Sequence, residues 1–218
     1  MAGSLVLYIG EKNVSSWSLR GWLALVHKNL PFEERTISLQ ADSDRSARRR
    51  VSPTGKVPVL HHDGLVIPDS LAIVEYLEET FPPPAYPGLW PSGRAERAHA
   101  RWLAAAMHSG FPKLRESMSF NLCFLERPPA PSAEALAEAA EMGGLWEAAL
   151  AAPRTAGPFL FGAFCAADIF FAPAVVRLTS FHVRMPARAA AYAEAVLAHP
   201  PVGRWMDAAR ALPPVEEH

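Results

Sequence analysis

The sequence predicts a small α/β domain followed by an all-helical domain. Short β-rich runs in the N-terminal part are separated by apolar residues at helical spacing, the pattern of strands joined by a crossover helix. Five prolines then fall within residues 82–91 and cannot continue a helix or a central strand. Ala-rich stretches with helical periodicity follow. We therefore expect domains at residues 1–82 and 92–218, joined by a Pro-rich linker at 83–91.

Composition and charge exclude several classes of protein. Of the 218 residues, 50% are hydrophobic and 20% charged, so the chain can bury a core. A net charge of -1 gives no field for a polyanion, and we expect no nucleic-acid partner. Cys123 and Cys165 form no CxxC pair or Cys/His cluster, so we expect no metal and a reducing compartment. The apolar run Leu5–Ile9 is too short for a signal or a membrane span, which favours a cytoplasmic protein without a membrane partner.

The first elements form a β-α-β unit. Leu5–Ile9, ended by a glycine, is typical of a strand buried on both faces of a sheet. Apolar residues recur at helical spacing between Leu19 and Val26, so a helix should begin near Ser15. Residues 33–39 read as a second strand, parallel to the first because a helix joins them.

A hairpin and further helices should follow. The β-rich runs 57–61 and 65–67 flank an Asp-Gly step, which is a strong signal for an antiparallel hairpin. Helical spacing resumes at Ser70 and ends before the prolines. In the second domain this spacing predicts helices over residues 94–107, 132–150, 166–178 and 188–199.

Pro58 is unusual because a proline within a β-rich run lacks the N–H that a sheet ladder needs. A cis Val57-Pro58 bond would turn the backbone N–H and C=O of Val57 outward, free to pair with a peptide-like ligand. A trans proline at an edge or bulge is the alternative.

Two helix starts carry side chains that either cap the helix or bind a ligand. Asp69 and Ser70 directly precede a helix, where free N–H groups can be capped or can hold an external carboxylate. Ser15, Ser16 and Ser18 surround the start of the first helix. These hydroxyls can serve as an N-cap, or one can donate a hydrogen bond to a bound thiolate and lower its pKa.

These features together resemble cytosolic glutathione transferases. Residues 15–20, Ser-Ser-Trp-Ser-Leu-Arg, are similar to the SSCSxR signature of the zeta class, and residues 52–60 and 69–77 to the family's glutathione-binding stretch. The resemblance implies a thioredoxin-like domain of order β-α-β-α-β-β-α, an all-helical second domain and a homodimer. It also implies an enzyme, a detoxifying transferase or a zeta-like isomerase, that uses glutathione as co-substrate with a small electrophile.

The resemblance assigns roles to the first domain's residues. Ser15 would be the catalytic hydroxyl, with Ser16 as the alternative because theta and delta enzymes place their serine one residue closer to the matching arginine. Trp17 stands where the zeta class has cysteine. Val57, beside a cis Pro58, would bind glutathione together with Lys56, which replaces the usual glutamine. Asp69 and Ser70 would bind its γ-glutamyl end.

In the second domain, the resemblance places a buried N-capping box at Cys165 and Asp168, which we interpret as a folding element. It places His108, Phe111 and Arg115, with Asn121 beyond them, on the first long helix facing the electrophile. Ordinary core or surface positions are the alternative for His108 and Phe111. One member of an arginine cluster would hold the glycyl carboxylate of glutathione, the alternative being that the cluster is only a solvated helix face. The cluster comprises Arg45, Arg48, Arg49 and Arg50.

Two other functions compete with a serine-dependent enzyme. A non-catalytic glutathione-fold module for binding or regulation needs no catalytic hydroxyl, so the serine motif favours the enzyme. A disulfide reductase needs a cysteine at the first helix, and residues 15–18 offer none.

Overall fold

The computed structural model describes residues 4–39, 42–120, 128–152 and 156–213. Asn121 and Cys123 lie outside these ranges. The chain divides into two compact units: the first runs to Leu89 and resumes at Arg204, and the second runs from Trp90 to Gly203. Within the described ranges, no helix is long and apolar enough to cross a membrane.

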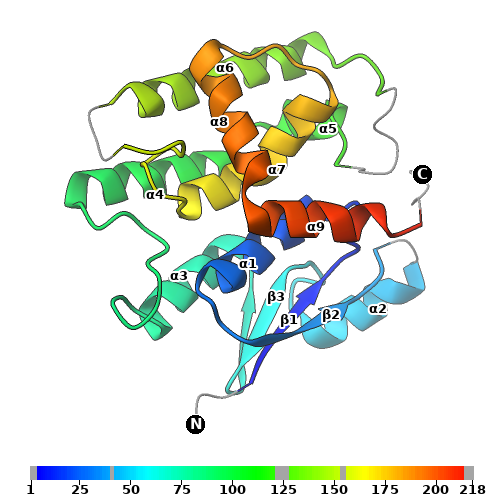
Figure 1. Cartoon of the computed structure of the whole chain (residues 1–218). Coiled ribbons are helices and arrows are strands. Elements are labelled where there is room, and N and C mark those ends of the chain that lie inside the picture. Colours follow the sequence, from blue (N-terminus) through cyan, green and yellow to red (C-terminus); the bar gives the residue numbers. More distant parts are fainter. Residues whose placement is uncertain (1–3, 40–41, 121–127, 153–155, 214–218) are drawn as a thin grey trace. The chain divides into compact units, whose positions relative to one another are not determined.

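The first unit has the predicted β-α-β-α-β-β-α order (Figure 1). Its elements are β1 (Leu5–Ile9), α1 (Ser16–His27), β2 (Phe32–Thr36), α2 (Asp42–Val51), β3 (Val59–His62), β4 (Leu65–Pro68) and α3 (Ser70–Thr80). The sheet order is β2-β1-β3-β4. β1 and β2 are parallel, and the β3–β4 hairpin is antiparallel, as predicted.

The register of the sheet decides which loops meet. Tyr8 near the end of β1 lies opposite Val59 at the start of β3, and Val59 lies opposite Pro68 at the end of β4. The segments that follow β1, precede β3 and follow β4 therefore leave the sheet at the same edge, the one formed by the ends of β1 and β4 and the start of β3. Both α1 and α3 begin at this edge, so two helix N-termini converge on it.

Helices α1 and α3 pack together on the sheet through buried leucine and isoleucine side chains. Gly21 permits a close approach of α1, because a Cβ at this position would lie 3.2 Å from Cβ and Cγ of Pro58 and 3.6 Å from Cδ1 of Ile73. The segment before β3 is thus fixed against both helices.

The second strand is shorter than expected. β2 ends at Thr36 rather than at residue 39, because the chain turns away after Ile37 donates a hydrogen bond to the carbonyl of Ile9 (2.8 Å). The N–H of Leu39 then bonds to the carboxylate of Glu11 at 3.0 and 3.2 Å. Because β2 is an edge strand with a mostly exposed surface, its pattern of apolar residues did not predict correctly where the strand ends.

A buried cation helps to hold the Pro-rich segment in place within the first unit. Lys28 is fully buried, and its Nζ donates to Oε2 of Glu78 (2.5 Å) and to the carbonyl of Phe81 (2.7 Å). The same Glu78 oxygen accepts from the N–H of Leu89 (2.9 Å). A buried ammonium needs such a partner, because burial without one is costly.

The second unit is helical. It contains α4 (Arg94–Ser109), α5 (Pro112–Ser117), α6 (Ala133–Ala151), α7 (Ala166–Ser180), α8 (Ala187–Ala198) and the start of α9 (Pro200–Arg210). The four predicted helices are present, whereas α5 and α9 were not predicted. Both missed helices begin with proline, which breaks a helix interior but fits its first turn.

The Asp168 carboxylate organises the start of α7, as the capping-box prediction requires. It is fully buried and accepts from the N–H of Cys165 at 2.8 Å and of Leu160 at 3.1 Å. Burial raises the pKa of Asp168 to about 6, although these two hydrogen bonds favour the ionised form. Cys165 is a free, buried thiol.

Candidate functional site

The first helix begins with a pair of linked hydroxyls. Ser15 is the N-cap of α1, and its Oγ accepts from the N–H of Ser18 at 3.4 Å. The two Oγ atoms lie 2.7 Å apart, with Ser15 donating. Ser18 Oγ also accepts from the N–H of Gly10 at 3.1 Å, which fastens the end of β1 to α1. Ser18 was not assigned a role from the sequence, although its three-residue spacing from the cap was the available signal.

Ser16 and Trp17 form the first turn of the same helix. Ser16, like Ser15, is buried, with 7% and 5% of their surfaces exposed. The guanidinium of buried Arg20 lies 4.3 Å from the Trp17 ring centroid. Trp17, which replaces the signature cysteine, therefore supports the arginine of the motif through a cation–π contact.

Val57 and Pro58 occupy the same sheet edge as this helix start. The Val57-Pro58 peptide bond is cis, as expected. Within the described part of the chain, no hydrogen bond engages the backbone N–H or C=O of Val57. A peptide ligand can therefore pair with this backbone as an added strand would. Lys56 is exposed beside it.

Asp69 and Ser70 complete the edge. Asp69 caps α3 through Oδ1, which accepts from the N–H of Leu71 at 2.7 Å and of Ala72 at 3.0 Å. Its φ of 149° lies in a region that non-glycine residues rarely adopt, as often found at binding sites. Ser70 is 1% exposed, and its hydroxyl has no hydrogen-bond partner among the described residues. A buried hydroxyl without a protein partner is what a ligand group would satisfy.

In the arginine cluster on α2, one arginine donates a hydrogen bond to the chain and the other three are exposed. Nη1 of Arg48 donates to the carbonyl of Ser38 at 2.7 Å. Arg45, Arg49 and Arg50 are exposed. Of these, Arg49 reaches the loop before Lys56, since its Cγ lies 3.2 Å from the Cβ position of Gly55.

The prediction that His108, Phe111 and Arg115 share one helix is wrong. α4 ends at Ser109, Phe111 has a left-handed φ of 58°, and Arg115 lies on α5. Pro112 causes the break, because its ring excludes the preceding residue from helical geometry.

The three residues of this junction have different surroundings. The His108 ring centroid lies 5.9 Å from that of Phe170, and Phe111 is buried. Arg115 donates from Nη1 to the carbonyl of Met107 at 3.2 Å, and burial lowers its pKa. Arg115 thus ties α5 back to the end of α4.

Sequence reasoning missed Arg177 on α7. It is buried, donates from Nη1 to the carbonyl of Met118, and lies 5.5 Å from the ring centroid of Phe120. The available signal was a single basic residue in a mostly apolar helix.

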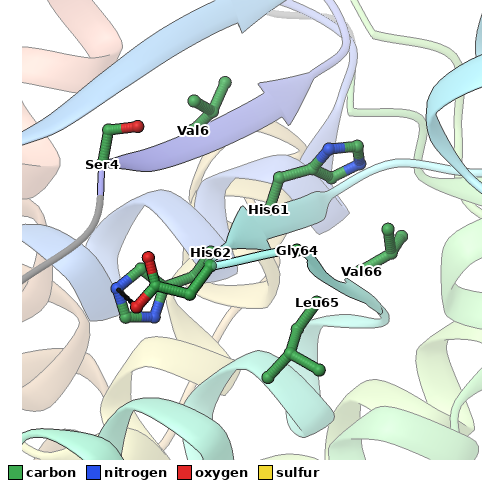
Figure 2. A pocket seen from close by; sticks show the side chains of 8 residues that line it. Ser4, Val6, His61, His62, Gly64, Leu65 and Val66 are labelled. Carbon is green, nitrogen blue, oxygen red and sulfur yellow. Dashed lines mark ion pairs between the residues drawn. The ribbon is translucent and has the colours of Figure 1, made fainter.

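A separate hollow of about 320 Å³ lies at the opposite edge of the sheet (Figure 2). Nδ1 of buried His62 lies 2.7 Å from the Tyr76 hydroxyl, and its Nε2 lies 3.7 Å from the carboxylate of Asp63. Because β1 starts here and the β3–β4 turn closes it, this hollow is distinct from the edge that carries Ser15. It is lined by Ser4, Val6, His61, His62, Asp63, Gly64, Leu65 and Val66.

Comparison with known proteins identifies the family. Residues 14–80, which include all of the edge just described, match the glutathione S-transferase N-terminal domain. Maleylacetoacetate isomerase from Rattus norvegicus is 32% identical over 84% of this chain and 82% of its own length. The chain belongs to the glutathione transferase family. Other curated relatives of this family are matched over about half of their own length, 49% in two cases.

Solved structures of the family share the fold. A glutathione transferase homologue from Burkholderia, determined with bound glutathione, is 30% identical, with a TM-score of 0.69 over 96% of this chain and 99% of that one. A maleylacetoacetate isomerase from Anaeromyxobacter dehalogenans, determined with bound dicarboxyethyl glutathione and citrate, is 26% identical, with a TM-score of 0.67 over 97% of this chain and 98% of that one.

Proposed function

We propose that this chain is a glutathione-dependent enzyme in which Ser15 activates the glutathione thiol for attack on a small electrophile. The observation that carries the proposal is the Ser15–Ser18 hydroxyl pair, 2.7 Å apart, at the N-terminus of α1. It lies at the sheet edge that also presents the Val57 backbone and the Ser70 hydroxyl.

Ser15 is suited to stabilise a thiolate. Its Oγ accepts from the N–H of Ser18, and a rotation of both hydroxyls lets Ser18 donate to Ser15 while Ser15 donates to a sulfur. Accepting two hydrogen bonds polarises the Ser15 hydroxyl and makes it a stronger donor. The positive end of α1 acts in the same direction, and each unit of thiol pKa lowering corresponds to about 1.4 kcal/mol.

The remaining contacts hold the peptide. The Val57 backbone N–H and C=O pair with the cysteinyl backbone of glutathione, while Ser70 and the N-terminus of α3 receive the γ-glutamyl carboxylate. Asp69 caps that helix and lies where the γ-glutamyl ammonium binds. For the glycyl carboxylate we favour Arg49 or Lys56, because both side chains flank the loop before Val57.

The electrophile is a small molecule that accepts the thiolate, for conjugation or for isomerisation through a reversible adduct. The family relatives named maleylacetoacetate isomerase and the adduct bound in one of their structures support the isomerase form. His108 and Phe111 stay predictions for electrophile contacts. For Arg115 we favour a structural role, since one of its N–H groups holds Met107.

We also infer a cytoplasmic homodimer. Leu65 and Val66 on edge strand β4 are 53% and 44% exposed, and Trp102 on α4 is 54% exposed. Large exposed apolar groups of this kind mark interaction surfaces. A second copy of this chain would cover them in a two-fold assembly.

The test of this function compares binding with thiol ionisation. Calorimetry with glutathione should show saturable binding, and the ultraviolet absorbance of the thiolate during a pH titration should show a lowered thiol pKa in the complex. A binding module would show the first result without the second. Absence of saturable binding by the folded protein at millimolar glutathione would refute the proposal.

A further inference from the structure

The turn that carries Ser15 is anchored by residues from the far end of the sequence. The indole Nε1 of Trp205, on α9, donates to the carbonyl of Lys12 at 3.1 Å. The next residue, Asn13, donates from Nδ2 to the carbonyl of Pro213 at 2.9 Å. The donor residues Trp205 and Asn13 are both fully buried, and the two bonds are partly buried. All of these residues belong to the first unit.

The Lys12 side chain strengthens the same anchor. Its ammonium lies 5.3 Å from the ring centroid of Trp205 and 5.7 Å from that of Trp22, and it forms an ion pair with Glu34 at 2.7 Å. The rings of Trp22 on α1 and Trp205 on α9, the red helix in Figure 1, meet edge to face at 5.5 Å. One lysine therefore joins β2, α1 and α9.

The anchored carbonyl lies inside the turn that delivers Ser15 to the helix start. The carbonyl of Glu11 accepts from the N–H of Val14 at 3.2 Å and of Ser15 at 2.9 Å, which closes the turn around Lys12 and Asn13. Ser15 in turn meets Ser18 at 2.7 Å. The Lys12 carbonyl that Trp205 holds therefore lies within the hydrogen-bonded turn that ends at Ser15.

We propose that Trp205 is a positioning residue for thiol activation, acting through the Lys12 carbonyl on the orientation of Ser15. The proposal rests on the proposed function of Ser15. Trp205 has no contact with the reacting atoms in this scheme. Its indole N–H holds the turn in the geometry that lets Ser15 donate to sulfur, since misplacement of a donor weakens its hydrogen bond.

Trp205→Phe tests this directly, because it keeps an aromatic ring next to Lys12 and removes the N–H. Loss of one neutral hydrogen bond predicts a fall in kcat of about two- to tenfold, with a raised thiol pKa in the glutathione complex. Glutathione affinity and KM should change little, because Val57 and Ser70 are untouched. Trp22→Phe is the matched control: it alters a ring on the same lysine, and no hydrogen bond links the Trp22 indole to the turn in the described structure.

The outcomes separate the alternatives. A raised thiol pKa in Trp205→Phe but not in Trp22→Phe supports the positioning role. A lower melting temperature with an unchanged thiol pKa overturns it and leaves Trp205 as a packing residue. If Trp205→Phe does not fold, the test uses Asn13→Ser, which removes the other bond from the turn to the C-terminal segment. This variant must raise the thiol pKa, and an unchanged thiol pKa would overturn the proposal. The wild-type titration reports on Ser15 chemistry itself, and an unperturbed thiol there would instead refute the proposed function.

Discussion

The hydroxyls of Ser15 and Ser18 lie 2.7 Å apart, and a backbone N–H from the end of β1 donates to the second of them. This arrangement places the Ser15 hydroxyl at the N-terminus of α1, next to a Ser18 hydroxyl that can donate a hydrogen bond to it. It predicts that the two serines differ in kind, since Ser15 would contact sulfur and Ser18 would polarise Ser15.

Ser15→Ala should cut turnover about ten- to a hundredfold, because one charge-assisted hydrogen bond of about 1.5–3 kcal/mol is lost only after the thiol ionises. Glutathione affinity should hardly change. Ser16→Ala is the control, and the thiolate absorbance in a pH titration is the measurement. A raised pKa in Ser16→Ala instead would assign the reaction to Ser16, and no change in either variant would leave the backbone N–H groups as the thiolate donors.

Ser70→Ala should weaken glutathione binding severalfold with little loss of stability, because the Ser70 hydroxyl has no partner in the described chain. Calorimetry should be repeated with cysteinylglycine, which lacks the γ-glutamyl group. The variant and wild type should bind this dipeptide equally. An equal loss for both ligands would show that Ser70 does not meet the γ-glutamyl end.

The stability of wild type and Asp168→Asn should diverge with pH. The pKa of folded Asp168 is raised to about 6 from an ordinary value of 3.8, so the folded state binds this proton more tightly than the unfolded chain does. This contribution is fully present below the unfolded pKa and is lost as pH rises through about 6, for a total on the order of 3 kcal/mol. The asparagine variant lacks this titration. Chemical denaturation between pH 4.5 and 7.5 should therefore show the advantage of wild type over the variant growing as pH falls, and a constant difference would contradict the assignment.

Trp102→Glu should shift the sedimentation of this protein from twice the chain mass toward the monomer, because it places a charge on an apolar surface that a second copy covers. Trp102→Phe, which keeps an apolar ring at the same position, is the matched control. A wild-type monomer over a wide concentration range would rule out the dimer.

Much of the binding edge was predictable because its signals are local. The Asp-Gly step fixed the hairpin, and the hairpin brings Pro58 beside Asp69 once the strands pair. Gly110 and Pro112 are also local signals, and they mark the break between α4 and α5. The prediction missed this break because residues on both sides of it have helical spacing. The contact between Lys12 and Trp205 spans 193 positions, and no local pattern indicates a partner at that distance.

The return of the chain to its first unit at Arg204 affects the order in which the protein can fold during synthesis. The strands and α1 leave the ribosome early. Trp205, whose ring packs against Trp22, is synthesised only after the whole second unit. Until then Lys12 and Trp22 lack their neighbour, and the turn before Ser15 lacks both of its outer bonds. A nascent chain stopped at the Pro-rich segment would therefore contain every residue proposed to grip glutathione, yet hold its thiol-activating turn incompletely.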